Sequence, residues 1–123
     1  MKKTTAGTEK REYTLDAAGQ KLGRLATQIS NILLGKNEPD FQKNTMANVN
    51  VTVNNASKLD LSSARMNDEY KRYSGYPGGL KFETREHFLK KHGFAELIRK
   101  TVRNMLPANR LRKDTLKNIT VND

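Results

Sequence analysis

The fold is decided by the stretch Asn48-Val-Asn-Val-Thr-Val-Asn54, in which valines alternate with polar residues. Successive side chains of a strand point to opposite faces, so this alternation predicts a β-strand with one buried face. The β-branched valines favour the same assignment. A shorter alternation at Glu12-Tyr-Thr-Leu-Asp16 predicts an earlier strand, and Lys58-Leu-Asp-Leu61 is expected to extend or neighbour the central one.

Helical periodicity lies on both sides of this strand. Residues 22–34 repeat apolar side chains at steps of three and four, and Gly35 is a suitable C-terminal stop. A second helical region is predicted to begin after Thr84 as N-cap, to break at His92-Gly93, and to resume until Pro107. A short basic helix over 109–116 and a last strand over 118–121 follow, whereas 62–69 reads as a polar loop.

This order of elements predicts an α/β fold with helices layered over a small, partly parallel sheet. The length of 123 residues suits one domain, expected over residues 12–123 and preceded by a basic N-terminal arm over 1–11. The polar residues after Met1 do not resemble a signal peptide, and no segment is apolar for long enough to span a membrane.

The composition favours a polyanionic partner. Lys and Arg number 23 against 13 Asp and Glu, for a net charge of +10. Binding to phosphates releases counterions, so such an excess is typical of nucleic-acid binding, with a membrane surface as the competing polyanion. The chain has no cysteine, which excludes disulfides, thiolate metal sites and a cysteine nucleophile, and fits a reducing cytoplasm.

The positive charge is concentrated in the second half of the chain. Residues 99–117 hold seven basic residues against one acidic residue, and 71–92 hold six against two. Arg99, Lys100 and Arg103 share a helix face, where like charges repel each other unless an anion lies between them. A solvated face is the usual fate of a charge run, but the lack of alternating signs favours a phosphate-binding face.

The most distinctive segment is Tyr70-Lys-Arg-Tyr-Ser-Gly-Tyr-Pro-Gly-Gly-Leu-Lys81. Glycines permit close backbone approach, cations bind phosphates, and tyrosine rings stack on bases, so the segment points to RNA. The alternative is a glycine-rich turn with tyrosines packed beneath it.

The sequence shows no recognisable arrangement of catalytic residues. His87 and His92 lack a helical spacing and a ligand set for a metal, and Asp16 is expected to accept hydrogen bonds from the turn that follows it. Phosphate-binding glycine motifs and nucleophile elbows do not occur, so we predict no enzyme, no cofactor and no small-molecule substrate.

Five blocks in order resemble the bacterial ribosomal protein L13 (uL13) family of the large subunit. They are Asp16–Ala26, Gly35-Lys36, the valine strand ending in Asn54-Asn-Ala-Ser-Lys58, Ser74–Lys81, and Met105-Leu-Pro107 with Asn109-Arg-Leu111. The resemblance implies a three-layer α/β/α domain on a mainly parallel four-stranded sheet. It also implies a cytoplasmic, non-catalytic protein that binds 23S-type rRNA, contacts neighbouring large-subunit proteins and supports early subunit assembly.

The resemblance also implies where the RNA-binding residues lie. Arg24 and Lys36 are expected to flank the first helix, residues 71–81 to form an RNA-facing loop, and the basic C-terminal part to supply further cations. The expected RNA-binding residues are Arg24, Lys36, Lys71, Arg72, Tyr73, Tyr76, Gly78, Gly79, Lys81, Arg99, Arg103, Arg110, Arg112 and Lys113. A free RNA-binding regulator of mRNA translation is the alternative function, and a small nucleotide-dependent α/β enzyme is a more distant one.

Three departures from the family pattern stand out. Tyr73 replaces a usual histidine, so stacking can persist while a contact that depends on protonation cannot. Asn104 replaces a glycine, and Leu111-Arg-Lys113 replaces a Leu-Gly-Arg turn. The sequence stops at Asp123 without the family's His-Pro-His-containing tail, so contacts through that tail are expected to be absent or supplied by a neighbour.

Overall fold

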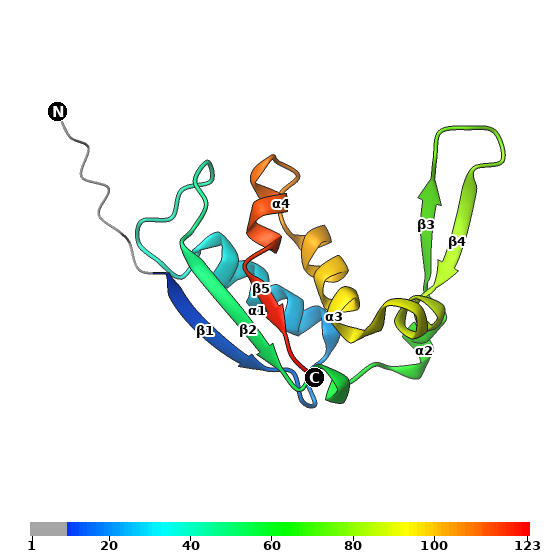
Figure 1. Ribbon diagram of the computed structural model, residues 1–123, viewed down its shortest axis with the longest axis horizontal. Coiled ribbons are helices and arrows are strands. Elements are labelled where there is room, and N and C mark those ends of the chain that lie inside the picture. The colour runs from blue at the N-terminus through cyan, green and yellow to red at the C-terminus, as the bar shows by residue number, and fades with distance from the viewer. Residues whose placement is uncertain (1–9) are drawn as a thin grey trace.

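A three-stranded parallel sheet forms the centre of the computed structural model, which describes residues 10–123. Its strands are β1 (Arg11–Asp16), β2 (Val49–Asn54) and β5 (Ile119–Val121), in the order β1-β2-β5 (Figure 1). Val51 lies opposite Tyr13 on one side and Ile119 on the other. The valine alternation therefore becomes the central strand, as the sequence predicts.

The alternation separates a buried face of the sheet from a polar one. Val49, Val51 and Val53 are buried, whereas the intervening Asn50 and Thr52 are half-buried. Burying the valine side chains supplies about 1.5–3 kcal/mol each before the entropy of ordering is counted.

Helix α1 (Leu22–Leu34) packs on the buried face of the sheet. Leu25, Ile29 and Leu33 are all buried, because they recur on one side of the helix. The helix ends at Gly35, whose φ of 73° is a left-handed cap conformation that glycine adopts without strain. These bounds confirm the predicted helix.

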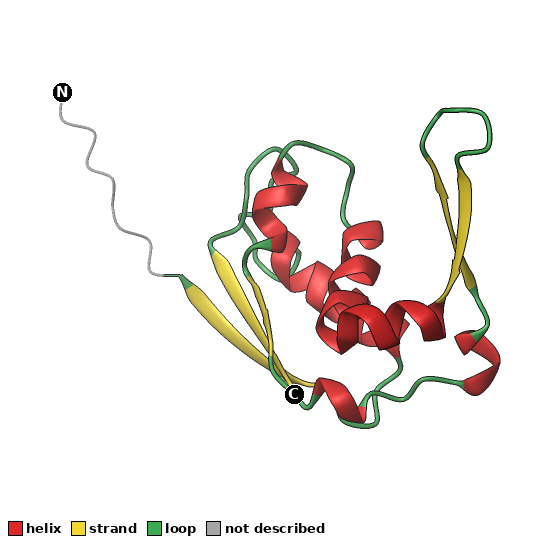
Figure 2. Cartoon of the chain, turned by 45° about the vertical axis from the view of Figure 1, so that its right-hand side comes forward, coloured by secondary structure: helices red, strands yellow, loops and turns green. Residues whose placement is uncertain are grey.

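Helix α3 (Arg85–Met105) packs across α1 and contains the predicted break. The Thr84 hydroxyl accepts a hydrogen bond from the backbone N–H of His87, and Gly93 has φ 84° and ψ 176° inside the helix. Leu97, Ile98 and Val102, beyond this kink, are buried. Helix α4 (Leu111–Leu116) then returns the chain to β5 (Figure 2).

The fourth strand and third layer are not confirmed in the part of the chain that the structure describes. Asn55, at φ 58°, turns the chain out of β2 into a short 3₁₀ helix, η1 (Ala56–Lys58). The segment after it makes only an isolated parallel bridge, between Lys21 and Asp60. On the other face of the sheet, Thr14 and Thr120 are exposed, so residues 10–123 supply no helix to cover it. The described domain is a mixed α/β fold with two layers.

Residues 62–84 differ most from the sequence prediction. The predicted polar loop contains a short helix, α2 (Ser63–Met66), and its last residue starts β3 (Glu69–Tyr73). Strand β3 pairs antiparallel with β4 (Leu80–Thr84), so the expected RNA-facing loop is a hairpin. Figure 1 shows this hairpin standing away from the helices and the sheet.

The predicted N-terminal arm lies mostly outside the described residues, which begin at Lys10. Arg11, the last residue of that arm, belongs to β1 and pairs with Val49. Its guanidinium also forms an ion pair with Glu38. No helix of residues 10–123 is long and apolar enough to cross a membrane.

Candidate nucleic-acid interface

The β3–β4 hairpin has two chemically different faces. Tyr73 lies opposite Leu80, and Lys71 opposite Phe82, so these four side chains share one face. The rings of Tyr73 and Phe82 are more than half exposed, and the Lys71 ammonium lies 6.0 Å from the centre of the Phe82 ring. This face offers aromatic surface with a cation beside it.

The opposite face carries Arg72 directly across from Lys81. Like charges in this arrangement destabilise a strand pair, and neither side chain forms an ion pair within residues 10–123. An anion placed between the two side chains would relieve the repulsion. The hairpin therefore presents an aromatic face and a cationic face, two kinds of surface that nucleic-acid-binding proteins commonly use.

The tip of the hairpin is a tight turn at Tyr76-Pro-Gly-Gly79. The backbone N–H of Gly79 donates to the Tyr76 carbonyl at 3.0 Å, and Gly78 has φ 74°, as a type II turn requires. A Cβ at position 79 would lie 2.1 Å from the Ser74 hydroxyl oxygen and 3.0 Å from the Tyr76 carbonyl oxygen, so a larger residue would require the Ser74 side chain to move. The turn leaves the Tyr76 ring 77% exposed.

The root of the hairpin is held by a cation–aromatic cluster on α3. The Lys100 ammonium lies 3.7 Å from the centre of the Tyr70 ring and 4.2 Å from that of Phe88. Arg85 donates to the Tyr70 hydroxyl at 3.3 Å and pairs with Asp68. These contacts fix the root against the body while the tip projects freely.

A basic hollow lies between the end of α3 and α4. It has a volume of about 900 Å³, and no acidic residue of the described chain lines it. Arg99 is partly engaged, because it pairs with Glu96 at 2.8 Å, and Lys117 pairs with Asp114 at 3.1 Å. We call this feature the basic hollow. Its cationic lining residues are Arg99, Arg103, Arg110, Arg112, Lys113 and Lys117.

A second basic groove connects the start of α1 with the root of the hairpin. Arg24 lies there, exposed, together with Arg85 and Lys100, in a groove of about 570 Å³. Asp60 is its one acidic lining residue within the described chain. The groove extends the positive surface from the hairpin root toward α1.

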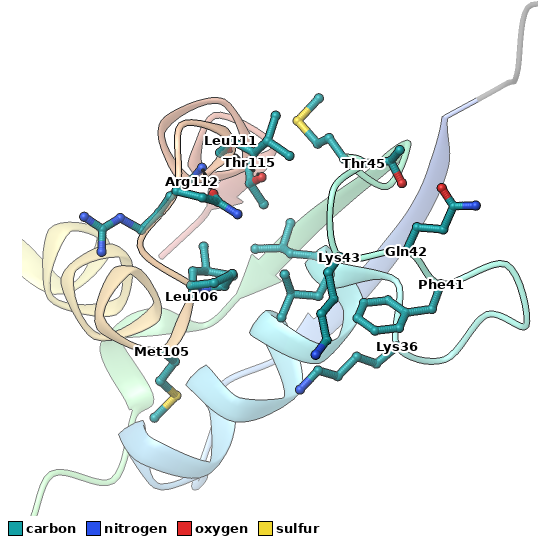
Figure 3. A pocket seen from close by; sticks show the side chains of 15 residues that line it. Lys36, Phe41, Gln42, Lys43, Thr45, Met105, Leu106, Leu111, Arg112 and Thr115 are labelled. Atoms are coloured by element: carbon teal, nitrogen blue, oxygen red, sulfur yellow. Dashed lines mark hydrogen bonds between the residues drawn. The ribbon is translucent and has the colours of Figure 1, made fainter.

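Lys36 lies apart from the basic hollow, at an apolar pocket of about 480 Å³. Leu33, Phe41 and Leu106 contribute to its walls, and Arg112 links it to the basic hollow (Figure 3). The pocket lies between the segment after α1 and the segment that leads into α4.

The titratable groups fulfil structural roles. Asp16 accepts a hydrogen bond from the backbone N–H of Ala18 at 3.0 Å, which confirms its predicted role in the turn and lowers its pKa, with a further contribution from Asn55. Hydrogen bonds from His87 and Lys90 likewise lower the pKa values of Glu83 and Glu86. Within residues 10–123, no group of His, Cys, Asp and Glu side chains could hold a metal ion.

The structure thus gathers most of the predicted site residues into two regions. Lys71, Arg72, Tyr73, Tyr76, Gly78, Gly79 and Lys81 lie on the hairpin, and Arg99, Arg103, Arg110, Arg112 and Lys113 line the basic hollow. Arg24 and Lys36 belong to neither region.

Sequence reasoning missed Phe82 on the hairpin and Phe41 with Lys43 at the apolar pocket. The alternation Leu80-Lys-Phe82 would have revealed Phe82 had the hairpin been predicted. Residues 36–47 carry no periodic pattern, so their apolar side chains gave no signal.

Comparison with known proteins supports one family. The family model described as "Ribosomal protein L13" matches residues 10–122. The chain belongs to the ribosomal protein L13 family. This confirms the resemblance inferred from the five sequence blocks.

Relatives in the L13 family align along most of their length. The "Large ribosomal subunit protein uL13" of Persephonella marina is 44% identical over 114 residues, which cover 91% of this chain and 75% of that protein. The proteins of the same name from Thermotoga petrophila and Rubrobacter xylanophilus are 41% and 36% identical, and each alignment covers 92% of this chain. The alignments cover 76% and 79% of those two proteins.

Proposed function

We propose that this chain is a structural, non-catalytic constituent of the large ribosomal subunit that binds 23S-type rRNA and supports early subunit assembly. It acts in the cytoplasm, on the large subunit, where rRNA and neighbouring large-subunit proteins are its partners. The L13 family match and relatives named as large-subunit proteins support this function.

The observation that carries the proposal is the basic hollow. It brings six cationic side chains to one surface, five from α3, α4 and the segment between them and the sixth, Lys117, from the residue after α4, with no acidic residue among its described lining. Cations at this density attract the closely spaced phosphates of RNA, and each phosphate bound releases counterions. Glu96 and Asp114 pair only with Arg99 and Lys117, so the other four cations have no ion-pair partner among residues 10–123.

The hairpin adds contacts of a different kind. Its Arg72 and Lys81 face suits a phosphate, while Tyr73 and Phe82 offer rings on which unpaired bases can stack. Phosphate contacts position RNA, and contacts to bases select a site within it. The two regions together can hold separate rRNA segments in a fixed relation.

The salt dependence of rRNA binding tests this proposal. We expect Arg103→Ala combined with Arg110→Ala to weaken binding to purified large-subunit rRNA. The slope of log affinity against log salt should fall by about one unit per lost phosphate contact. Filter binding across a salt series measures both quantities.

A matched variant removes two cations that already have acidic partners. Arg11 pairs with Glu38 and Lys90 with Glu86, so Arg11→Ala combined with Lys90→Ala loses the same charge outside the basic hollow. Its slope should stay close to that of the unmodified chain. Equal slopes for all three proteins would show that the basic hollow faces solvent.

A further inference from the structure

The apolar pocket beside Lys36 differs from the rest of the cationic surface. Its volume of about 480 Å³ lies within the range of about 300–1,000 Å³ that is typical of small-molecule sites. Phe41, Met46 and Met105 are exposed by 37%, 45% and 42% at this pocket, although large apolar side chains normally pack inside. Exposed apolar side chains that gather around one pocket favour an interaction site there.

The rim of the pocket is cationic. Lys36, Lys43 and Arg112 line it, and no acidic side chain is among its described lining residues. Figure 3 shows the Lys36 and Lys43 side chains converging beside the Phe41 ring. The occupant should therefore be flat and apolar where it meets Phe41, and anionic near the lysines.

The pocket is also lined by polar side chains that can form hydrogen bonds with the edge of a flat ligand. Gln42 and Asn109 each offer an amide that donates and accepts hydrogen bonds, and Thr45 offers a hydroxyl. Nucleobases carry donors and acceptors on their edges and a flat face for stacking. This combination matches a base better than a purely apolar group.

The pocket is also continuous with the basic hollow. Asn109 and Arg112 line both, so a strand held on the basic hollow passes directly by the pocket. Continuity with the basic hollow favours RNA over an apolar peptide as the occupant. An apolar peptide carries no phosphates that could bind the six adjoining cations.

We propose that the pocket accepts one unstacked nucleobase of the RNA that lies on the basic hollow. The base stacks on Phe41 and fills the space lined by Leu33 and Leu106, while the Lys36 and Lys43 ammonium groups bind the adjoining phosphates. This inference rests on the proposed rRNA binding. It adds a site that binds a base next to the basic hollow, which binds phosphates.

Ultraviolet cross-linking of the full chain to purified large-subunit rRNA tests the site directly, without a substitution. Cleavage after Lys36 and Lys43 releases the peptide of residues 37–43, which contains Phe41. We expect mass spectrometry to find a nucleotide attached to this peptide. Nucleotides attached only to hairpin or basic-hollow peptides would overturn the inference.

Binding measurements on two variants give a second readout. Phe41→Ala should weaken rRNA binding about 5- to 150-fold, the range expected for the loss of one stacked base. Phe41→Tyr keeps a stacking ring and should bind like the unmodified chain. The salt slope should be the same in all three proteins, because Phe41 carries no charge.

The outcomes separate this inference from the proposed function. If the unmodified chain binds rRNA with its full salt slope but Phe41→Ala binds equally well, the pocket does not hold a base, while the proposed function stands. If assembled subunits instead yield chemical cross-links from Lys43 to another protein and no nucleotide on the 37–43 peptide, the pocket belongs to a protein segment and the inference fails. A chain that does not bind rRNA at all contradicts both.

Discussion

Tyr70 and Tyr76 belong to one glycine-rich stretch but occupy opposite environments. The ring of Tyr70 meets Phe88 edge-on at 5.5 Å and lies under the Lys100 ammonium, so it anchors the hairpin. The ring of Tyr76 is 77% exposed at the tip. Its exposure shows that Tyr76 does not pack in the core, and its stacking on RNA stays a prediction.

We expect Tyr76→Ala to weaken rRNA binding by about 1–3 kcal/mol, because a stacked base would lose its partner ring. The melting temperature should not change, since the exposed ring packs against little of the protein. Isothermal titration and thermal melting measure the two effects. Tyr76→Phe serves as control and should retain the affinity. A lower melting temperature with unchanged affinity would instead assign the ring a structural role.

Asp16 gives a prediction of how stability depends on pH. Hydrogen bonds from the Ala18 N–H and Asn55 favour the charged form, so the folded-state pKa lies below its ordinary value of 3.8. Such a carboxylate stabilises the fold fully above its unfolded pKa, and the stabilisation disappears as the pH falls through the folded value.

Asp16→Ala should therefore lower the melting temperature at neutral pH. The difference from the unmodified chain should shrink in acid, below pH 3.8. Melting curves recorded from pH 7 downward test this. A difference that stays constant into acid would show that the Asp16 charge does not contribute.

At the level of elements, the helices and strands with strong local signals were predicted well. Gly35 ends α1, Thr84 caps α3, and Gly93 kinks it, as expected from the sequence. Each of these features depends on the residue itself, since glycine adopts positive φ at little cost and a threonine hydroxyl caps an N-terminus.

The β3–β4 hairpin and the apolar pocket were harder to predict. Strand β3 lacks alternation, because Tyr70-Lys-Arg-Tyr73 places one aromatic residue on each face of the hairpin. Its partner strand is recognisable only once the turn at Pro77 and Gly78 is taken as a hairpin tip. The apolar pocket assembles from residues far apart in sequence, such as Phe41 and Leu106.

The hairpin provides a prediction in which stability and binding change in opposite directions. Lys81→Gln removes the repulsion with Arg72 and should slow hydrogen exchange of the β3–β4 amides. The gain should lie at the lower end of about 0.2–1 kcal/mol, because solvent screens exposed charges. The same variant should bind rRNA more weakly.

Lys90→Gln is a suitable control for the hairpin, because Lys90 is exposed, lies on α3 and pairs with Glu86. It should change neither the exchange of the hairpin amides nor the affinity. If Lys81→Gln bound rRNA as well as the unmodified chain, the cationic face of the hairpin would not contact phosphate.

Across the whole molecule, the cationic side chains and the packed core occupy different places. The core lies between one face of the parallel sheet and helices α1 and α3, while the candidate contacts lie on the projecting hairpin and around α4 (Figure 2). A small domain of this kind can position widely separated RNA contacts on a rigid body. That is the task of a structural protein within a ribonucleoprotein.

Sedimentation of a cell lysate through a sucrose gradient, at magnesium low enough to separate the ribosomal subunits, tests the central claim most directly. We expect the chain to migrate with the large subunit, to remain there through a moderate salt wash, and to be absent from the small-subunit fractions. Recovery of the chain in the light fractions, free or with messenger RNA alone, would contradict its assignment as a constituent of the large subunit.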